Sequence, residues 1–229
     1  MKTIGLLGGM SWESTESYYR AINQGVKQRL GGLHSAKIAL ISVDFAEIEA
    51  LQHRGDWDKT ADILAQGAQS LQRAGADFML ICTNTMHKVV PQIQAQVDLP
   101  ILHIADATAG VLLADGVRKT GLLGTRFTME QDFYRERLIS HGIEVVVPEE
   151  SERQQVHRII YDELCLGNIN DDSRRQYLQI IERLQDRGCE AVILGCTEIS
   201  LLVRPEDTQV PLYDTTAIHA QQAVDEALG

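Results

Sequence analysis

The stretch TIGLLGG, residues 3–9, decides the fold because it returns later in the chain as KTGLLG, residues 119–124. Each copy is a short apolar run that ends in glycine, which is typical of a buried strand followed by a tight turn. A second landmark repeats in the same order: AGADFMLICTNTMH, residues 74–87, matches RGCEAVILGCTEIS, residues 187–200. Ordered landmarks of this kind predict an internal duplication.

Apolar runs alternate with helical patterns along the first half of the chain. Strands are predicted at residues 3–9, 37–45, 77–84 and 99–104, and helices at residues 14–31, 58–75 and 85–97. The last strand, LPILHI, is echoed by VPLYD at residues 210–214, which is a third landmark of the repeat. Strands that are apolar throughout and separated by helices indicate a parallel sheet covered on both faces.

The duplication predicts an α/β fold of two pseudosymmetric domains. Each domain is expected to be a mostly parallel sheet flanked by helices, with the active site in the cleft between the two. Residues 1–104, joined by the C-terminal segment 215–229, are expected to form the first half, and residues 105–214 the second.

Composition narrows the class of partner. The net charge of -11 argues against nucleic acid or an anionic membrane as the main partner, so a small molecule is favoured. No apolar run approaches the roughly 20 residues that a membrane helix needs, and the N-terminus lacks the pattern of a signal peptide. The cysteines form no C-x-x-C pair, which argues against a zinc knuckle or a thioredoxin-like motif. Without a secretory signal, we expect reduced thiols in a cytoplasmic protein. They are Cys82, Cys165, Cys189 and Cys196.

Polar residues follow the two matching buried strands at the same point. Thr83, Asn84 and Thr85 come after the first, and Cys196, Thr197 and Glu198 come after the second. Ligands of open parallel sheets bind outside the carboxyl ends of the strands, so both groups are candidate substrate-binding residues. Backbone N–H groups at the helix starts that follow would suit a substrate carboxylate.

One proton-transfer group on each side of an atom fits the inversion of a carbon that carries a hydrogen. One group removes the proton, the carbanion flattens, and the other returns a proton to the opposite face. A cysteine thiolate suits the role of base, and its pKa is expected to fall at a helix N-terminus, where Cys196 stands. This scheme requires neither a metal nor a pyridoxal cofactor, so no cofactor is expected.

The segments GLLGGMSWEST, CTNTMH and GCTEI, within doubled α/β halves, closely resemble the aspartate/glutamate racemase family over essentially the whole chain. The resemblance implies cofactor-independent two-base racemisation and a homodimer. It also implies two active-site cysteines, one in a CNT-x-H segment and one in GCTE. The second corresponds to Cys196. The first corresponds to Thr83 and not to Cys82, because Asn84 and His87 fix the register.

This departure predicts a lopsided catalytic pair. Cys196 is a competent base, whereas the hydroxyl of Thr83 is better suited to donate or relay a proton. The resemblance therefore implies an aspartate/glutamate racemase that is L-selective in turnover. Cys82 is predicted to be the inert last residue of the buried strand.

Specificity is a second departure. Many relatives carry a lysine in the segment that corresponds to YDELCLGNI, where this chain has Leu164 and Cys165. The missing cation leaves broad-specificity amino-acid racemisation open. Gln52 lies in a loop-like stretch after the second strand and is expected to reach the substrate, as is Met10 after the first glycine turn. Arg54, close to Gln52, is as consistent with a solvated loop as with the site.

Two rival functions remain. A Cys-His hydrolase would use Cys196 as nucleophile and His87 as base. A non-catalytic amino-acid-binding protein would bind ligand without exchanging hydrogen, since half of the usual thiol pair is missing. His87, four residues after Thr83, either tunes the site or has a structural role.

Overall fold

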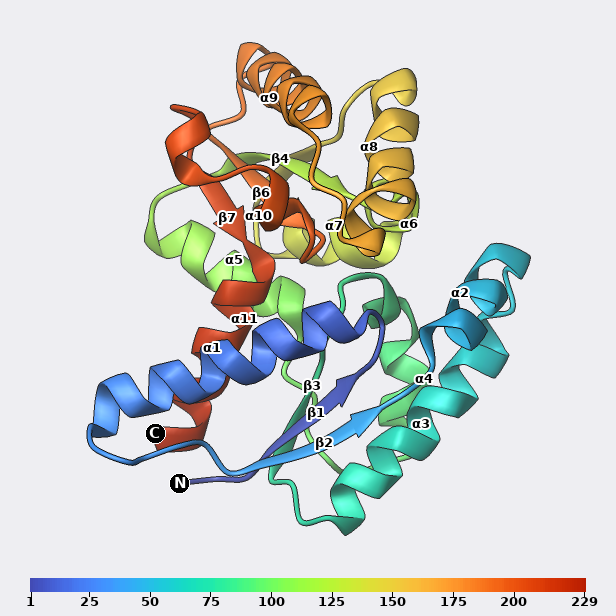
Figure 1. Ribbon diagram of the computed structural model, residues 1–229, viewed down its shortest axis with the longest axis vertical. Coiled ribbons are helices and arrows are strands. Elements are labelled where there is room, and N and C mark those ends of the chain that lie inside the picture. The colour runs from blue at the N-terminus through green and yellow to red at the C-terminus, as the bar shows by residue number, and fades with distance from the viewer. The chain divides into compact units, whose positions relative to one another are not determined.

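The computed structural model describes all 229 residues and divides them into two compact units. Unit 1 comprises Met1–Ile104 and His219–Gly229, and unit 2 comprises Ala105–Ile218. Each unit is a parallel sheet with helices packed on its faces, so the α/β class and the two-domain organisation predicted from the sequence are confirmed (Figure 1).

The sheet of unit 1 has three parallel strands in the order β2-β1-β3. They are β1 (Ile4–Gly8), β2 (Ile38–Ser42) and β3 (Phe78–Ile81). The segment predicted as a fourth strand joins this sheet by a single parallel bridge, Met79 to Ile101, so its pairing is shorter than expected.

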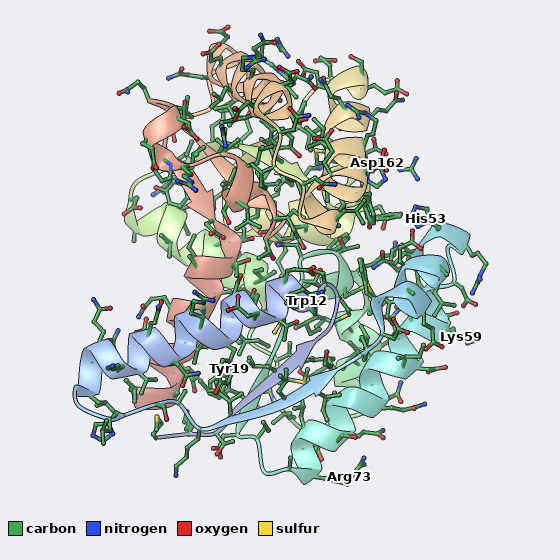
Figure 2. The ribbon with its side chains drawn as sticks, in the orientation of Figure 1. Trp12, Tyr19, His53, Lys59, Arg73 and Asp162 are labelled. Atoms are coloured by element: carbon green, nitrogen blue, oxygen red, sulfur yellow. The ribbon has the colours of Figure 1, made fainter.

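Six helical segments belong wholly or mainly to unit 1. They are α1 (Trp12–Leu30), α2 (Phe45–Arg54), α3 (Trp57–Arg73), the 3-10 helix η1 (Thr85–Val89), α4 (Val90–Gln94) and α11 (Thr215–Leu228). The N-cap of α1 is Ser11, so the helix begins earlier than the predicted residue 14. Its first residue, Trp12, is 67% exposed (Figure 2). The start of α2, which the sequence pattern did not reveal, is capped by Asp44.

Both faces of the first sheet are covered, which explains its uniformly apolar strands. Successive strand residues point to opposite faces, so Leu6 and Leu7 enter different cores. Leu6 packs in the cluster that contains Tyr18 of α1, and Leu7 packs in the cluster that contains Leu64 of α3. Figure 1 shows α1 and α3 on opposite sides of the sheet.

The sheet of unit 2 repeats this order with one more strand, β5-β4-β6-β7, and all its pairs are parallel. The strands are β4 (Lys119–Gly124), β5 (Glu144–Val146), β6 (Ala191–Gly195) and β7 (Leu212–Asp214). Its helical segments are α5 (Ile104–Ala114), α6 (Arg126–Glu130), α7 (Asp132–Ser140), α8 (Glu150–Asp162), η2 (Leu164–Leu166), α9 (Asp171–Asp186), α10 (Ile199–Leu202) and η3 (Pro205–Asp207). Strands β4, β5 and β6 thus occupy the places of β1, β2 and β3.

The glycines of the repeated motif are required where the chain turns out of a strand. Gly9 has φ +91°, and a Cβ built on it would lie 2.2 Å from the Val43 carbonyl oxygen. A Cβ on Gly195 would lie 2.8 Å from the Leu123 carbonyl oxygen. Side chains at either position would displace the neighbouring strand end.

The boundary near the C-terminus differs by four residues from the expected one. Residues 215–218 were expected in the first half, and the structure places them in unit 2. The hydroxyl of Thr215 donates to the Leu194 carbonyl and that of Thr216 to the hydroxyl of Thr197, which ties the start of α11 to the end of β6. No helix has the length and apolarity needed to cross a membrane.

Candidate active site

The first predicted group, Thr83, Asn84 and Thr85, forms a turn at the carboxyl end of β3. Thr83 is half-buried, and Asn84 and Thr85 are buried. The turn leads into η1, which the short α4 follows directly. The single regular helix expected over residues 85–97 is therefore divided into two segments. We call residues 82–85 the Thr83 turn.

Hydrogen bonds fix the backbone of the Thr83 turn. The Thr83 N–H donates to the Ile81 carbonyl at 2.8 Å. The hydroxyl of Ser14 donates to the Cys82 carbonyl at 2.7 Å, and Nδ1 of His87 donates to the Thr83 carbonyl at 2.8 Å. Two consecutive carbonyls are thus held by side chains from α1 and η1, which leaves the turn little freedom to change shape.

Cys82 has the environment of a core residue. Its side chain is fully buried among the apolar residues between the first sheet and α1. Burial raises the pKa of its thiol far above the ordinary range, because the thiolate would lose its hydration. Cys82 is therefore a neutral thiol with no route to chemistry.

The predicted binding residues Met10 and Gln52 both lie inside unit 1. Met10 is buried in the core cluster beneath β1 and β3. Gln52 is also buried, and its Nε2 lies 2.9 Å from Sδ of Met86. The expectation that Gln52 and Arg54 lie in a loop was wrong, because both lie in α2, on either side of the outward-pointing His53 (Figure 2). Arg54 is exposed at the end of this helix.

The second predicted group lies at the carboxyl end of β6 and is bound differently. We call residues 195–198 the Cys196 turn. The thiol of Cys196 donates to Oε2 of Glu198 at 3.0 Å, so the thiol has a carboxylate as its hydrogen-bond acceptor. Glu198 is 5% exposed, and Thr197 accepts a hydrogen bond from the hydroxyl of Thr216. The thiol and the carboxylate form a preassembled acid–base pair.

The environment of Cys196 raises the pKa of its thiol well above the ordinary value, contrary to the lowered pKa expected from a helix N-terminus. Burial is the main cause, and the negative charge of Glu198 is the next. The helix that follows, α10, begins only at Ile199 and has four residues, so its dipole offers little compensation. The resting thiol is protonated, and a base is needed to remove its proton.

Leu164 and Cys165, the residues found where the resemblance implied a lysine, lie beside the Cys196 turn. Cys165, in η2, packs against the same core cluster as Cys196, and its charge is among the influences that raise the pKa of the Cys196 thiol. Leu164 is buried in that cluster. This side of the turn therefore offers an apolar and thiol-lined wall.

A cationic side chain that the sequence motifs do not reveal, Arg126, lies just after the end of β4. Gly124 pairs with Gly195, so Arg126 follows β4 just as Thr197 follows β6. Arg126 is exposed, and its backbone N–H donates to Nδ1 of His157 at 3.2 Å. Among the first three residues after each of the seven strands, it is the only arginine or lysine. The repeat carried the signal, since Arg126 occupies the place of Met10.

Comparison with known proteins assigns the family. The family model described as Asp/Glu/hydantoin racemase matches residues 7–223. This chain belongs to that family. Among solved structures, a candidate Asp/Glu racemase from Yersinia pestis is 58% identical over all of both chains with a TM-score of 0.94. An aspartate racemase homologue from Pyrococcus horikoshii is 35% identical over all of both chains with a TM-score of 0.87.

A curated relative indicates the range of substrates within the racemase family. The broad-specificity amino-acid racemase of Bacillus subtilis is 23% identical over 98% of each chain. The family resemblance drawn from the motifs is thus confirmed. Membership of a racemase family supports an isomerase.

The structure also bears on metal binding. No three or more His, Cys, Asp or Glu side chains converge in a geometry that could hold a metal ion. The predicted residues come together in two separate sets, one in each strand-end turn, together with Met10 and Gln52 in the interior of unit 1.

Proposed function

We propose that this chain is a cofactor-independent amino-acid racemase that acts on aspartate or glutamate by two-base proton transfer at Cα. The single observation that carries the proposal is the hydrogen-bonded pair of Cys196 and Glu198 at the end of a central strand, in a chain of the racemase family. A homodimer in the cytoplasm is part of the same proposal, by analogy with the family.

In the proposed reaction, the two turns act on opposite faces of the substrate Cα. Glu198 accepts the proton of the Cys196 thiol, and the resulting thiolate removes the α-proton. The electron pair left on Cα delocalises into the substrate carboxylate, which backbone N–H groups at Asn84, Thr85 and Thr197 bind and stabilise. A proton then reaches the other face of Cα from the Thr83 hydroxyl. Thr83 is reprotonated from solvent and Glu198 releases its proton to solvent, which restores the starting state of both turns.

The pair is unequal because a hydroxyl is a far weaker acid than a thiol, so its ionised form, which could remove a proton, is scarcely populated near neutral pH. Abstraction by Cys196 is fast, whereas abstraction by Thr83 from the opposite enantiomer is slow. We assign the fast direction to the L-enantiomer, on the family resemblance. The two enantiomers have equal free energies, so kcat/KM for complete racemisation is the same in both directions. The inequality appears in kcat and KM separately and in hydrogen exchange without inversion.

Arg126 supports an acidic substrate. It supplies the positive charge that the Leu164-Cys165 segment lacks, and it follows the strand next to the one that carries Cys196. A guanidinium binds a carboxylate through two parallel N–H donors. The alternative is a broad-specificity racemase, which the Bacillus subtilis relative favours.

The structure disfavours the Cys-His hydrolase. Nδ1 of His87 donates to the Thr83 carbonyl, and its Nε2 accepts from the Ile104 N–H at 3.2 Å. Both nitrogens are engaged within unit 1, so neither is placed to serve as a base. The acceptor of the Cys196 proton is Glu198. The non-catalytic binding protein is the remaining rival.

The test is incubation of the purified protein with single enantiomers and no added cofactor, followed by chiral analysis. Each enantiomer of aspartate, glutamate, alanine and lysine is used. Formation of the opposite enantiomer of aspartate or glutamate, unaffected by a chelator or by a carbonyl reagent that traps pyridoxal, supports the proposal. Equal activity on alanine and lysine supports broad specificity. Ligand binding without any product would support the non-catalytic binding protein. Release of ammonia would support the Cys-His hydrolase.

The matched variant for substrate class is Arg126→Gln. It should raise KM for L-glutamate about tenfold, because one charge-assisted contact of about 1.5 kcal/mol is lost. The KM of a neutral amino acid, if that is turned over, should not rise.

A further inference from the structure

A buried group of three histidines lies behind the Thr83 turn. We call His87, His103 and His219 the histidine cluster. The ring centroids of His87 and His103 are 4.6 Å apart, and those of His87 and His219 are 5.8 Å apart. All three side chains are buried within unit 1. A positive charge on one of these buried rings would lose its hydration and repel a charge on the next ring.

The hydrogen-bond partners fix the tautomer of His87. A carbonyl oxygen can only accept, so Nδ1, which lies 2.8 Å from the Thr83 carbonyl, carries the proton. A backbone N–H can only donate, so Nε2 accepts from Ile104 at 3.2 Å and carries none. If Nε2 were protonated, its N–H and the Ile104 N–H would be two donors facing each other without an acceptor.

The neighbouring ring has the opposite tautomer. Nε2 of His219 lies 2.8 Å from the Leu102 carbonyl and must donate, so Nδ1 accepts from the hydroxyl of Tyr18 at 2.8 Å. Burial lowers the pKa of His219 to about 3, and the nearby His87 contributes. The ring next to His87 is therefore also neutral and fixed at both nitrogens.

The bond from His87 determines which way the peptide between Thr83 and Asn84 faces. In a planar trans peptide the C=O and the N–H point in opposite directions. His87 holds the Thr83 carbonyl toward the histidine cluster, so the Asn84 N–H points to the other side of the peptide. If this peptide rotated by half a turn, a carbonyl oxygen would face that side, and a bound carboxylate would be repelled.

We propose that His87 is a positioning residue, which holds the peptide between Thr83 and Asn84 so that the Asn84 N–H faces the substrate carboxylate. The inference rests on the proposed racemase function, since it assigns a partner to that N–H. His87 touches no reacting atom. It acts through the backbone of Thr83, whose hydroxyl is the weaker of the two proton-transfer groups.

Two substitutions separate positioning from mere structural support. In His87→Asn, the amide nitrogen stands where Nδ1 stands and can still donate to the Thr83 carbonyl, while the Ile104 N–H loses its acceptor. In His87→Gln, the longer side chain reaches the place of Nε2 and can accept from Ile104, while the Thr83 carbonyl loses its donor. Each variant removes one buried hydrogen bond, so the two should lose similar thermal stability.

The expected result is a difference in activity between variants of matched Tm. His87→Gln should lose about ten- to a hundredfold in kcat/KM for L-glutamate, because the carboxylate donor is misaimed. His87→Asn should recover most of that loss. Equal activities in the two variants would overturn the inference while leaving the proposed function intact. A wild-type protein inactive on every amino acid would instead overturn the proposed function.

A second measurement does not depend on activity. Two-bond ¹H–¹⁵N spectra of the wild-type protein report the tautomer of each histidine ring. His87 should show a proton on Nδ1, and His219 should show one on Nε2 and should not titrate between pH 5 and 8. A proton on Nε2 of His87 would remove the bond to the Thr83 carbonyl and contradict the inference, whatever the enzyme turns over.

Discussion

The Thr83 turn and the Cys196 turn occupy equivalent places in the two sheets but differ in chemistry. The Thr83 turn carries a hydroxyl on a backbone held by Ser14 and His87. The Cys196 turn carries a thiol hydrogen-bonded to a carboxylate. A duplicated scaffold has thus placed an acid–base pair at one strand end and a rigid turn at the other. The comparison teaches that equivalent positions in a repeat need not share a catalytic role.

The largest effect should come from Cys196→Ala, which removes the strong base. Turnover of L-glutamate should fall by at least about a thousandfold. Circular dichroism and Tm should remain close to those of the wild type, because the side chain is small and not part of the apolar core proper. Retention of wild-type turnover would end the assignment of the base.

Glu198→Gln tests how the Cys196 turn works. The carboxylate accepts the thiol proton, so its loss should reduce turnover about a hundredfold. The same carboxylate raises the pKa of the Cys196 thiol, so its loss should lower that pKa. Alkylation of Cys196 by iodoacetamide at pH 7, followed by mass spectrometry of its peptide, should therefore become faster as turnover becomes slower. Slower alkylation would show that Glu198 promotes the resting thiolate, contrary to this account.

Acid should weaken the histidine cluster behind the Thr83 turn. The pKa of His219 is about 3 in the folded protein and about 6.5 in the unfolded chain, so between these values only the unfolded state binds the proton. The contribution is complete above about pH 6.5 and is lost as the pH falls toward 3. At pH 5 this single group should cost about 2 kcal/mol of unfolding free energy relative to neutral pH.

The control for this pH effect is His219→Gln, which can still donate to the Leu102 carbonyl. Its unfolding free energy, from urea titrations at pH 7 and pH 5, should fall by about 2 kcal/mol less than that of the wild type. Equal losses in both proteins would mean that His219 is not held neutral by its surroundings.

Thr83→Cys should make the two turns more alike. A second thiol at the working position should raise hydrogen exchange from D-glutamate about tenfold, since a thiol is the better base. Exchange from L-glutamate should change little. If exchange from the D-form stays the same in a folded variant, the inequality of the two turns has another source.

The smallest effect is predicted for Cys82→Ala, next to the working position. The side chain is buried and its thiol neutral, so kcat/KM should stay within about twofold of the wild type. A folded variant without activity would place the working residue at Cys82 and shift the register of the motif.

The sequence predicts those features that depend on local pattern and on the repeat. Apolar runs located β1 to β3 of the first sheet and β4, β6 and β7 of the second, and the matched segments located both strand-end turns. The expected helix over residues 85–97 was less regular: η1 ends at Val89, and the separate α4 begins at Val90 with Pro91 in its first turn. Gln52 was misplaced because α2 is short and follows β2 almost directly.

The electrostatics of the site were beyond the sequence. A raised pKa at Cys196 results from burial and from a carboxylate brought to 3.0 Å of the thiol, and neither follows from the spacing of the two residues. The histidine cluster brings together His87 of η1, His103 from the segment before α5, and His219 of α11. These elements lie far apart in the chain. Arg126 could have been identified from the sequence, because the repeat aligns it with Met10.

The most direct test of the unequal turns is the ratio of exchange to inversion in deuterium oxide. Proton NMR follows loss of the α-proton from L- and D-glutamate, and chiral analysis of the same samples follows inversion. A fast Cys196 base and a slow Thr83 donor predict that L-glutamate loses its α-proton several times faster than it inverts, with the ratio falling toward one in Thr83→Cys. Equal rates of exchange and inversion from both enantiomers of the wild-type protein would contradict the account.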